Sequence, residues 1–506
     1  MTSNPYCLLK FIANIAKKHK ISMGDIATQC EMSRSTLYRQ LRKNADIPPA
    51  ILSRVIQVIQ FTPEENSDLN ALLHPSDDLS VYERAFPLVD TLLHEKTFCP
   101  DVTSLLHTLN VYQGQQKEKS TFEQITKEIC QKIQKENLQA HIHVVGYTPA
   151  HLFPQLIYLV SLMMSVSNEV TVEQLICLEK NDATDAIKTM LYALSLVCYN
   201  RYQLFYHEGK QDKTYTGIFE NSISIMLSKP TEDVLSRGTQ NSYYLLSCLQ
   251  EGEVQCLTYH DDATYAFYMF FYHQLRTVHS KGLISFRNIA GFSKQMAEFE
   301  TGGSQVLFKQ DLCQNNIPVE AYHAMHKRLT IKEKLELVSG VMGRNIEPKA
   351  ADAYIQNLID QLVLRNKTTN RYPYYVLCNK QGLEYLAQTG LFIDGVVPLP
   401  AFNKKERIMI FEHLLMRVNN PNDTMKLVLV EKQLLPLDYI IEVSEQNGVL
   451  IDFGKGTIYG RSQNIHINAE MITQTLLAYA IQAYETQQKT SPNTCSNFLK
   501  GLLAGL

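Results

Sequence analysis

The 506-residue sequence has no C-x-x-C pair, no long uninterrupted apolar run, no P-loop and no G-x-S-x-G nucleophile motif. Its eleven cysteines are scattered, which disfavours a disulfide framework or a structural zinc site and predicts reduced, mostly buried thiols. The longest apolar stretch, residues 152–166, is interrupted by Pro154, Gln155 and Ser161. Because a bilayer crossing needs roughly 18–20 clean apolar residues, this stretch predicts a buried helix instead.

The N-terminus also lacks the pattern of a signal peptide. The apolar stretch at residues 8–16 is broken by Lys10, and lysines follow at 17, 18 and 20 where a small-residue cleavage site would stand. Together with the missing membrane span, this predicts a cytoplasmic protein without membrane contact.

Length and composition favour several folded domains. At about 100–200 residues per domain the chain should hold roughly three. The hydrophobic content of 45% and charged content of 20% are typical of globular proteins and exclude a disordered or fibrous chain. No internal sequence repeat of convincing period is visible.

The charge is distributed unevenly along the chain. The first 62 residues hold nine Lys/Arg and three Asp/Glu, a net charge of +6, whereas the remainder holds 39 basic and 48 acidic residues, a net charge of −9. A compact basic module on an acidic body suits a protein that meets a polyanion with one part only, although an ordinary basic helical cap has the same charge.

The first 75 residues predict five short helices. Apolar residues recur at three- and four-residue spacing over 8–16, 23–30, 34–43 and 49–59, and a fifth helix begins at Thr62. Ser22 and Ser33 stand where N-caps belong, and Pro48 and Pro49 open the fourth helix, where a missing N–H costs nothing.

The second and third of these helices predict a helix-turn-helix. Small Ala27 permits close packing, while Ile26, Cys30, Met32 and Leu37 fill the space between the two helices. The outward positions of the third helix carry hydroxyl, guanidinium and amide groups suited to phosphate oxygens and base edges. The predicted DNA-binding residues are Arg34, Ser35, Thr36, Tyr38, Arg39, Gln40, Arg42 and Lys43. Glu31 occupies the turn position where glycine is commonest.

These segments carry a family resemblance. Residues 26–27, 32–39 and 61–65, with the Pro-Pro-led fourth helix between them, resemble the five-helix DNA-binding domain of lambda-repressor and Cro type (XRE-family) bacterial regulators. The resemblance covers about 70 of the 506 residues. It implies a helix-turn-helix head that binds double-stranded DNA, commonly as a homodimer.

The rest of the chain predicts a mixed α/β body. Helical patterns continue to about residue 140, after which short β-branched segments alternate with apolar helices. The predicted strands are 141–147, 173–178, 202–206, 223–227, 254–259, 374–377 and 426–430, and 439–443 and 449–453 form a hairpin. A last helix is expected over 469–484, and a loosely held tail from Ser491.

We therefore expect an all-α helix-turn-helix head, a helical linker and a mixed α/β body. The predicted domains are residues 1–75 for the head, 76–140 for a linker or dimerisation segment, 141–302 for a sensor-like α/β domain and 303–506 for a second α/β domain.

Fragments of catalytic motifs are present, but none is complete. His279-Ser280-Lys281 matches the opening of the phospholipase D-like H-x-K signature, yet Phe286 stands where its acid belongs. Asp452-Phe453-Gly454 lacks the other kinase motifs, and the glycines at 454, 456 and 460 lack dinucleotide-site spacing. The clusters His260, Asp261, Asp262, His273 and His323, His326 follow no metal-site pattern. No catalytic residue, metal or cofactor is predicted.

One aromatic-rich segment, residues 259–272, suggests either a ligand pocket or a packed core. Aromatic side chains with polar tips can line an apolar pocket and offer hydrogen bonds at its wall. The candidate ligand-binding residues are Tyr259, Tyr265, Tyr268 and Tyr272.

Together these patterns favour a non-enzymatic, homodimeric transcription regulator whose body senses an unidentified small molecule or peptide. An enzyme or degenerate phospholipase D-like phosphodiesterase with an accessory DNA-binding head is the alternative. A scaffold whose N-terminal helices bind protein is a third reading.

Overall fold

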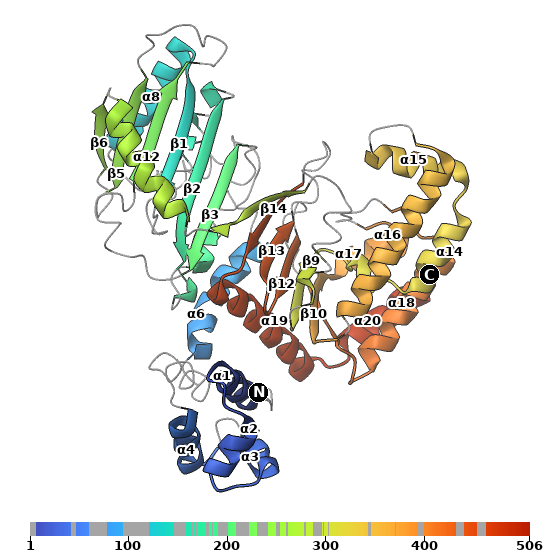
Figure 1. The fold of residues 1–506 in the computed structure, drawn as a ribbon. Helices are drawn as coiled ribbons and strands as arrows, with labels where there is room; N and C mark the ends of the chain where they lie inside the picture. The colour runs from blue at the N-terminus through green and yellow to red at the C-terminus, as the bar shows by residue number, and fades with distance from the viewer. Residues whose placement is uncertain are drawn as a thin grey trace. The chain divides into compact units, whose positions relative to one another are not determined.

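The computed structural model (Figure 1) divides into two compact units, Met1–Val81 and Tyr82–Leu506. It describes residues 7–41, 47–59, 78–94, 121–145, 158–160, 162–163, 165–167, 169–178, 182–184, 186–190, 201–208, 222–229, 241–248, 254–259, 262–277, 280–286, 296, 298–301, 303–342, 346–369, 371–392, 399–431, 440–452 and 462–506.

Unit 1 is helical, as its sequence predicts. Its described helices are α1 (Cys7–Lys18), α2 (Met23–Gln29), α3 (Arg34–Leu41) and α4 (Pro49–Ile59). One buried cluster joins all four, with Leu8 and Ile12 of α1, Ile26 and Ala27 of α2, Leu37 and Leu41 of α3, and Val55 and Ile59 of α4. The fifth helix expected from Thr62 lies outside the described residues.

Unit 2 contains two seven-stranded sheets. Sheet A has the order β6-β5-β4-β1-β2-β3-β7. Its strands are β1 (Gln139–Val145), β2 (Val170–Leu178), β3 (Tyr202–Glu208), β4 (Ser222–Ser228), β5 (Ser242–Cys248), β6 (Val254–Tyr259) and β7 (Ser280–Lys281). The pairs β1–β2 and β2–β3 are parallel, and every other pair is antiparallel.

Sheet B has the order β11-β10-β9-β12-β13-β14-β8. Its strands are β8 (Leu283–Phe286), β9 (Gln305–Lys309), β10 (Tyr374–Asn379), β11 (Met425–Val430), β12 (Ile440–Ser444), β13 (Gly448–Asp452) and β14 (Ser462–Ile467). The pairs β9–β10 and β10–β11 are parallel, and the others are antiparallel.

The two sheets share one topology. Each sheet begins with three parallel strands. The fourth strand in sequence lies antiparallel beside the first of these three and starts an antiparallel meander of three strands. Strands β1 to β6 therefore correspond in order and direction to β9 to β14. A helix follows the sixth strand in both, α12 (Asp262–Thr277) and α19 (Glu470–Thr490). Unit 2 is therefore an internal structural duplication, although its sequence shows no repeat.

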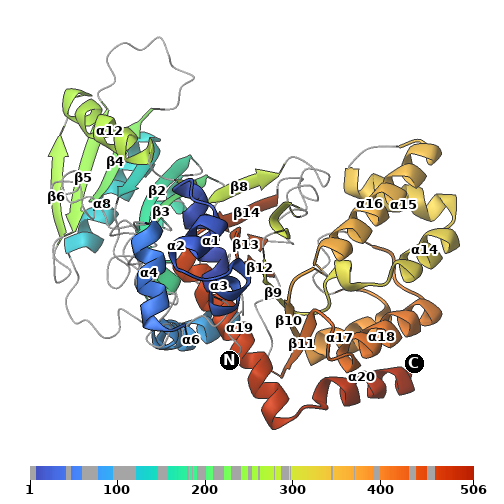
Figure 2. The same cartoon turned by 60° about the horizontal axis from the view of Figure 1, so that its bottom comes forward.

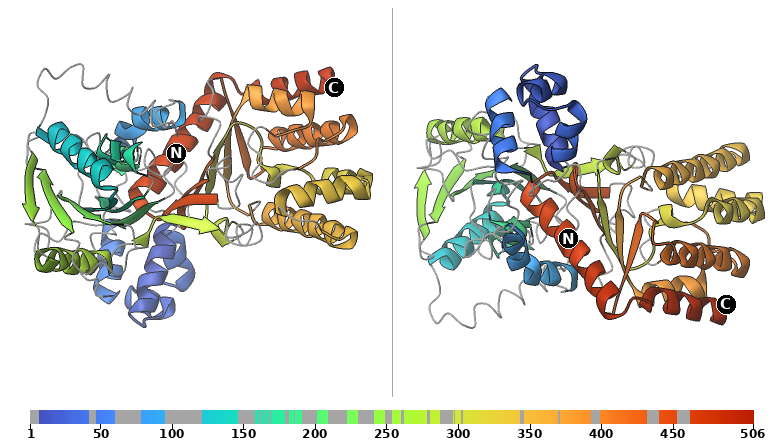
Figure 3. Two further views of the ribbon diagram at one scale, coloured as in Figure 1. Left: turned by 90° about the horizontal axis from the view of Figure 1, so that it is seen from above. Right: turned by 90° about the horizontal axis from the view of Figure 1, so that it is seen from below.

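Helices cover both faces of each sheet (Figures 2 and 3). In sheet A, α12 covers one face, and α8 (Thr121–Glu136) lies on the other, where Lys132 donates to Ser242 of β5 at 2.7 Å. In sheet B, α19 covers one face and also contacts α6 (Asp78–His94) through Tyr479. The opposite face packs against the remaining helices, which are α14 (Val319–Arg328), α15 (Ile331–Met342), α16 (Pro348–Thr369), α17 (Lys380–Thr389), α18 (Lys404–Asn419) and α20 (Thr494–Gly505).

One extended segment, residues 280–286, joins the two sheets. Its first part, β7, pairs with β3 of sheet A, and its second part, β8, pairs with β14 of sheet B. Gly282 lies between them, donating to the Leu204 carbonyl at 2.9 Å and accepting from the His466 N–H at 2.7 Å. A Cβ at Gly282 would lie 3.3 Å from the Leu204 and Tyr206 side chains, so this crossing favours glycine.

Most predicted strands are confirmed, with shifted ends. The 439–453 hairpin forms as β12 and β13, and Gly448 there adopts the left-handed conformation at φ 88°. The prediction of a loosely held tail after Ser491 is wrong. The segment forms α20, whose Cys495 and Leu499 are buried in the helical core beside α18, because its apolar residues recur at helical spacing.

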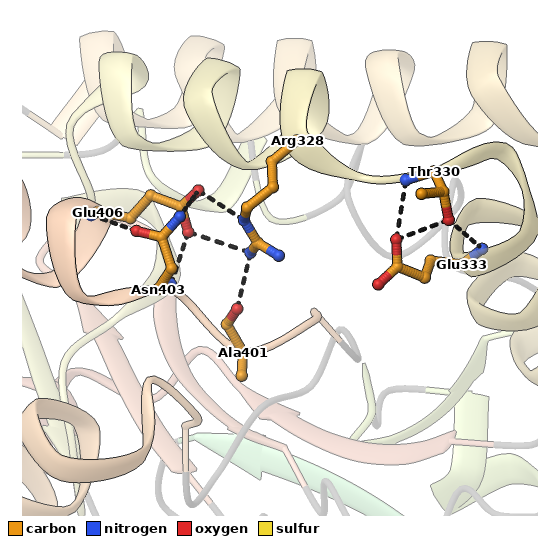
Figure 4. A network of polar contacts seen from close by, with 6 residues as sticks. All are labelled: Arg328, Thr330, Glu333, Ala401, Asn403 and Glu406. Carbon is orange, nitrogen blue, oxygen red and sulfur yellow. Dashed lines mark hydrogen bonds and ion pairs between the residues drawn. The ribbon is translucent and has the colours of Figure 1, made fainter.

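An ion pair fixes the start of α18 to the end of α14 (Figure 4). Arg328 donates from Nε and Nη2 to the two oxygens of Glu406, at 2.9 and 3.1 Å, and from Nη2 to the Ala401 carbonyl at 2.9 Å. The same Glu406 accepts from the Asn403 N–H at 2.7 Å in a capping box. One buried carboxylate thus caps α18 and binds α14.

We expect Glu406→Gln to lower the free energy of unfolding by about 1–3 kcal/mol, because the amide keeps the cap but loses the charged acceptor of Arg328. Glu333→Gln is the matched control, since Glu333 closes a similar capping box with Thr330 on the surface. Urea unfolding of both variants measures the difference. Equal losses would show that the ion pair adds nothing beyond the cap.

Candidate nucleic-acid interface

The α2–α3 connection is a tight turn between two short helices. Ser22 and Asp25 form a capping box at the start of α2, with Ser22 Oγ accepting from the Asp25 N–H at 3.1 Å. After α2 the Met32 N–H donates to the Ala27 carbonyl at 3.0 Å, and Glu31 takes the left-handed conformation at φ 56°. These are features of a Schellman-type helix end, so Glu31 performs the turn that glycine commonly makes.

Helix α3 has a buried apolar face and a partly exposed polar face. Ser33 caps it by accepting from the Thr36 N–H at 3.1 Å, and Leu37 and Leu41 are buried against the other helices. Of the predicted DNA-binding residues, Arg34, Ser35 and Arg39 are exposed, whereas Thr36, Tyr38 and Gln40 are half-buried. Arg42 and Lys43 lie outside the described residues.

Several of these side chains contact one another. Arg34 donates from Nη2 to the Tyr38 hydroxyl at 3.2 Å, and its guanidinium carbon lies 5.4 Å from the centre of the Tyr38 ring. The hydroxyls of Ser35 and Thr36 each lie 2.9 Å from Ser33 Oγ. The Gln40 Oε1 is buried, with no hydrogen-bond partner among the described residues, so it faces inward.

Basic side chains of neighbouring segments are also exposed in unit 1. Lys17 and Lys18 end α1, Lys20 follows it, and Arg54 lies on α4. Arg54 approaches Glu31 of the turn at 3.7 Å, between two exposed side chains. No acidic residue occurs in α3 itself, so its outer face can approach a polyanion.

Two of the four predicted ligand-binding tyrosines, Tyr268 and Tyr272, belong to the core of sheet A. Tyr268 and Tyr272 of α12 are buried against Val145, Leu175 and Phe205. Tyr265 stacks on Tyr243 at 4.5 Å between ring centres, and Tyr259 lies in β6. The other side of α12 exposes Phe267 and Phe270. The sequence showed the aromatic density but not this division between two helix faces.

The catalytic fragments are not brought together into a site within the described residues. Lys281 is exposed in β7 and Phe286 ends β8, while His279 and residues 453–460 lie outside the described residues. His326 is paired with Asp352 at 3.0 Å. No group of three or more potential metal ligands occurs among the residues that the structure describes.

Sequence reasoning missed a buried charged cluster in sheet B. Arg365 binds Glu300 through three hydrogen bonds of 2.6–3.1 Å, and Lys309 lies 2.9 Å from Asp311. Glu442 lies 3.9 Å from Arg365. The sequence signal for this cluster was the presence of charged residues inside the apolar strands β9 and β12.

Desolvation raises the pKa of Glu442 to about 7, and it raises the pKa of Asp452, at the end of β13, to about 7 as well.

Comparisons with known proteins give little guidance. No family model matches the chain, and no curated protein matches it. Several solved structures have low similarity to the chain, among them the following two. One is phosphatidylserine synthase of Haemophilus influenzae Rd KW20, with a TM-score of 0.21, 9% identity, and coverage of 84% of this chain and 97% of that one.

The other is polyphosphate kinase from Porphyromonas gingivalis, with a TM-score of 0.20, 11% identity, and coverage of 92% of this chain and 64% of that one. TM-scores this low establish neither a shared fold nor a shared activity.

Within the described parts of the chain, no helix is both long and apolar enough to cross a bilayer.

Proposed function

We propose that the protein is a DNA-binding transcription regulator in which unit 1 reads duplex DNA with α3. The observation that carries this proposal is the outward display of Arg34, Ser35 and Arg39 on a helix whose other face, Leu37 and Leu41, is buried. Arg34 and Arg39 contact guanine edges or phosphates, and the hydroxyls near the start of α3 bind phosphate oxygens.

Unit 2 serves as the sensing and assembly part of this regulator. One helix-turn-helix spans a half-site, so two copies of the chain place two heads about one helical turn apart on the operator. A small molecule or peptide bound by unit 2 needs only about 1–3 kcal/mol of coupling to change operator occupancy several-fold.

DNA binding by the full chain should weaken steeply with salt. Each phosphate that a lysine or arginine neutralises contributes about −0.9 to the slope of log K against log salt concentration. Fluorescence anisotropy with a duplex selected from a random pool measures this slope. Affinity that does not change with salt, or no preference for the selected duplex, would count against the proposal.

A second candidate function is a phosphodiesterase, complete or degenerate. It is favoured by the place of Lys281, which is exposed on the segment that joins the two duplicated sheets. Phosphodiester hydrolysis by the wild type that is lost in Lys281→Ala, and kept when exposed Lys332 on α15 is replaced by alanine, would establish it. The regulator proposal expects no such hydrolysis.

A further inference from the structure

Two polar side chains in sheet A lie opposite each other with unused hydrogen-bonding capacity. His143 of β1 pairs directly with Ser224 of β4, so both side chains leave the same face of the sheet, with Cβ atoms about 4.5–5.5 Å apart. Ser224 is fully buried. Neither Ser224 Oγ nor His143 Nδ1 has a hydrogen-bond partner among the residues that the structure describes.

This arrangement is costly without a further group. A buried hydroxyl or ring nitrogen that gives up water without a new partner costs about 1–3 kcal/mol. The pair lies on the face that α12 covers, because the Tyr272 ring of α12 packs edge-on against the His143 ring with 4.8 Å between centres. Ser224 Oγ and His143 Nδ1 therefore lie on the side of sheet A that α12 covers, not on the side of α8.

The ionisable side chains around the pair are mostly basic. His143 faces His141 on its own strand, Glu173 on β2, and His273 and Arg276 on α12. Opposite Glu173, β3 contributes the uncharged Gln203.

The one carboxylate in this set is already used. Glu173 accepts from the Tyr272 hydroxyl at 3.1 Å and lies 3.5 Å from Arg276. Burial first, and then His141, His273 and Arg276, lower the pKa of His143 to about 4. Because Arg276 keeps its charge at neutral pH, an anion beside it is favoured over a cation, and a bound anion would also favour protonation of His143.

We propose that His143, Ser224 and Arg276 form a binding site for a small oxyanion, such as inorganic phosphate, sulfate or the phosphate group of a metabolite. Ser224 and His143 donate one hydrogen bond each to its oxygens, and Arg276 supplies a fixed positive charge from α12. The ligand touches two strands and one helix, so its binding fastens α12 to sheet A. The site requires no activity of unit 1.

Sulfate is the best first probe, because it stays doubly charged between about pH 5 and pH 8, where histidine titrates. Calorimetric titration of the full chain should show saturable binding that tightens as the pH falls. The bound anion raises the pKa of His143, so binding takes up a proton.

His143→Gln and Ser224→Ala should each weaken sulfate binding about tenfold, which corresponds to the loss of one hydrogen bond to an ion. His143→Gln should also remove most of the pH dependence. His413→Gln is the matched control, since His413 is a half-buried histidine of α18 whose pKa is also lowered by burial, and it should bind like the wild type. Ser224→Ala removes only a hydroxyl, so it should fold normally without ligand.

Three results would overturn the site. They are the absence of saturable binding, equal affinity in wild type and Ser224→Ala, and an unchanged pH dependence in folded His143→Gln. Phosphate and glycerol 3-phosphate, titrated in the same way, then distinguish a free anion from a phosphorylated metabolite. Tighter binding of the ester that is still lost in Ser224→Ala identifies the metabolite as the occupant.

Discussion

Replacing Arg34 and Arg39 together with alanine should lower the affinity of the full chain for its selected duplex by on the order of 100-fold or more. Each arginine that reads a base is worth about 1–3 kcal/mol of discrimination. Both side chains are exposed, so their loss leaves the core around Leu37 and Leu41 intact. Anisotropy titrations at fixed salt measure the loss, and circular dichroism checks the helices.

The control for this double variant is Lys17→Ala with Lys18→Ala, which removes the same charge from the end of α1. If α3 reads the bases, the lysine variant should bind selected and random duplexes more weakly by the same factor. The arginine variant should lose the preference between them. Equal loss of preference in both, or none in either, would contradict a reading role for α3.

The described helices of unit 1 could be predicted from sequence because their signals are local. Ser22 and Ser33 cap the helices that follow them, and Leu37 and Leu41 are spaced for one buried face. Glu31 was the one departure from the pattern, and the structure accommodates it with a left-handed backbone. Motif matching does not show that a non-glycine residue can adopt this unfavourable backbone conformation. The hydrogen bonds at the end of α2 hold Glu31 in it.

The body was predicted less completely because the order of strands in its two sheets depends on contacts between residues distant in sequence. Alternation located β1 and β4, but β14 reads as a polar segment, and β9 is a short, fully buried strand ending in Lys309. The duplication left no sequence trace, since a sheet topology needs only apolar residues at matching positions. The oxyanion site was also missed, because it depends on the register between β1 and β4.

The charged cluster of sheet B predicts that unit 2 loses stability as the pH rises. The group contains four carboxyls, Glu300, Asp311, Glu442 and Asp452, against two cations, Lys309 and Arg365. Arg365 is committed to Glu300 and Lys309 to Asp311 by their short contacts. Burial favours the protonated forms of Glu442 and Asp452, and it outweighs the positive charges of Lys309 and Arg365, which favour the ionised forms.

The direction of this effect follows from the two pKa values. Glu442 and Asp452 each have a folded-state pKa raised to about 7, above ordinary values of 4.5 and 3.8. The folded state therefore holds more protons than the unfolded state between about pH 4 and pH 7. The contribution is fully present below about pH 4, falls across that window, and is absent above about pH 7, a total change on the order of a few kcal/mol.

Asp452→Asn should remove part of this dependence, because the amide is neutral at every pH. We expect the variant to match the wild type near pH 4 and to exceed its unfolding free energy near pH 8, measured by urea denaturation across that range. Asp352→Asn is the control of opposite sign, since Lys334 first and then His326 lower the pKa of that carboxyl. Its removal should destabilise the protein at neutral pH. If Asp452→Asn is instead less stable than the wild type at pH 8, the ionised carboxylate of Asp452 stabilises the folded state. The predicted loss of stability with rising pH would then be wrong for this residue.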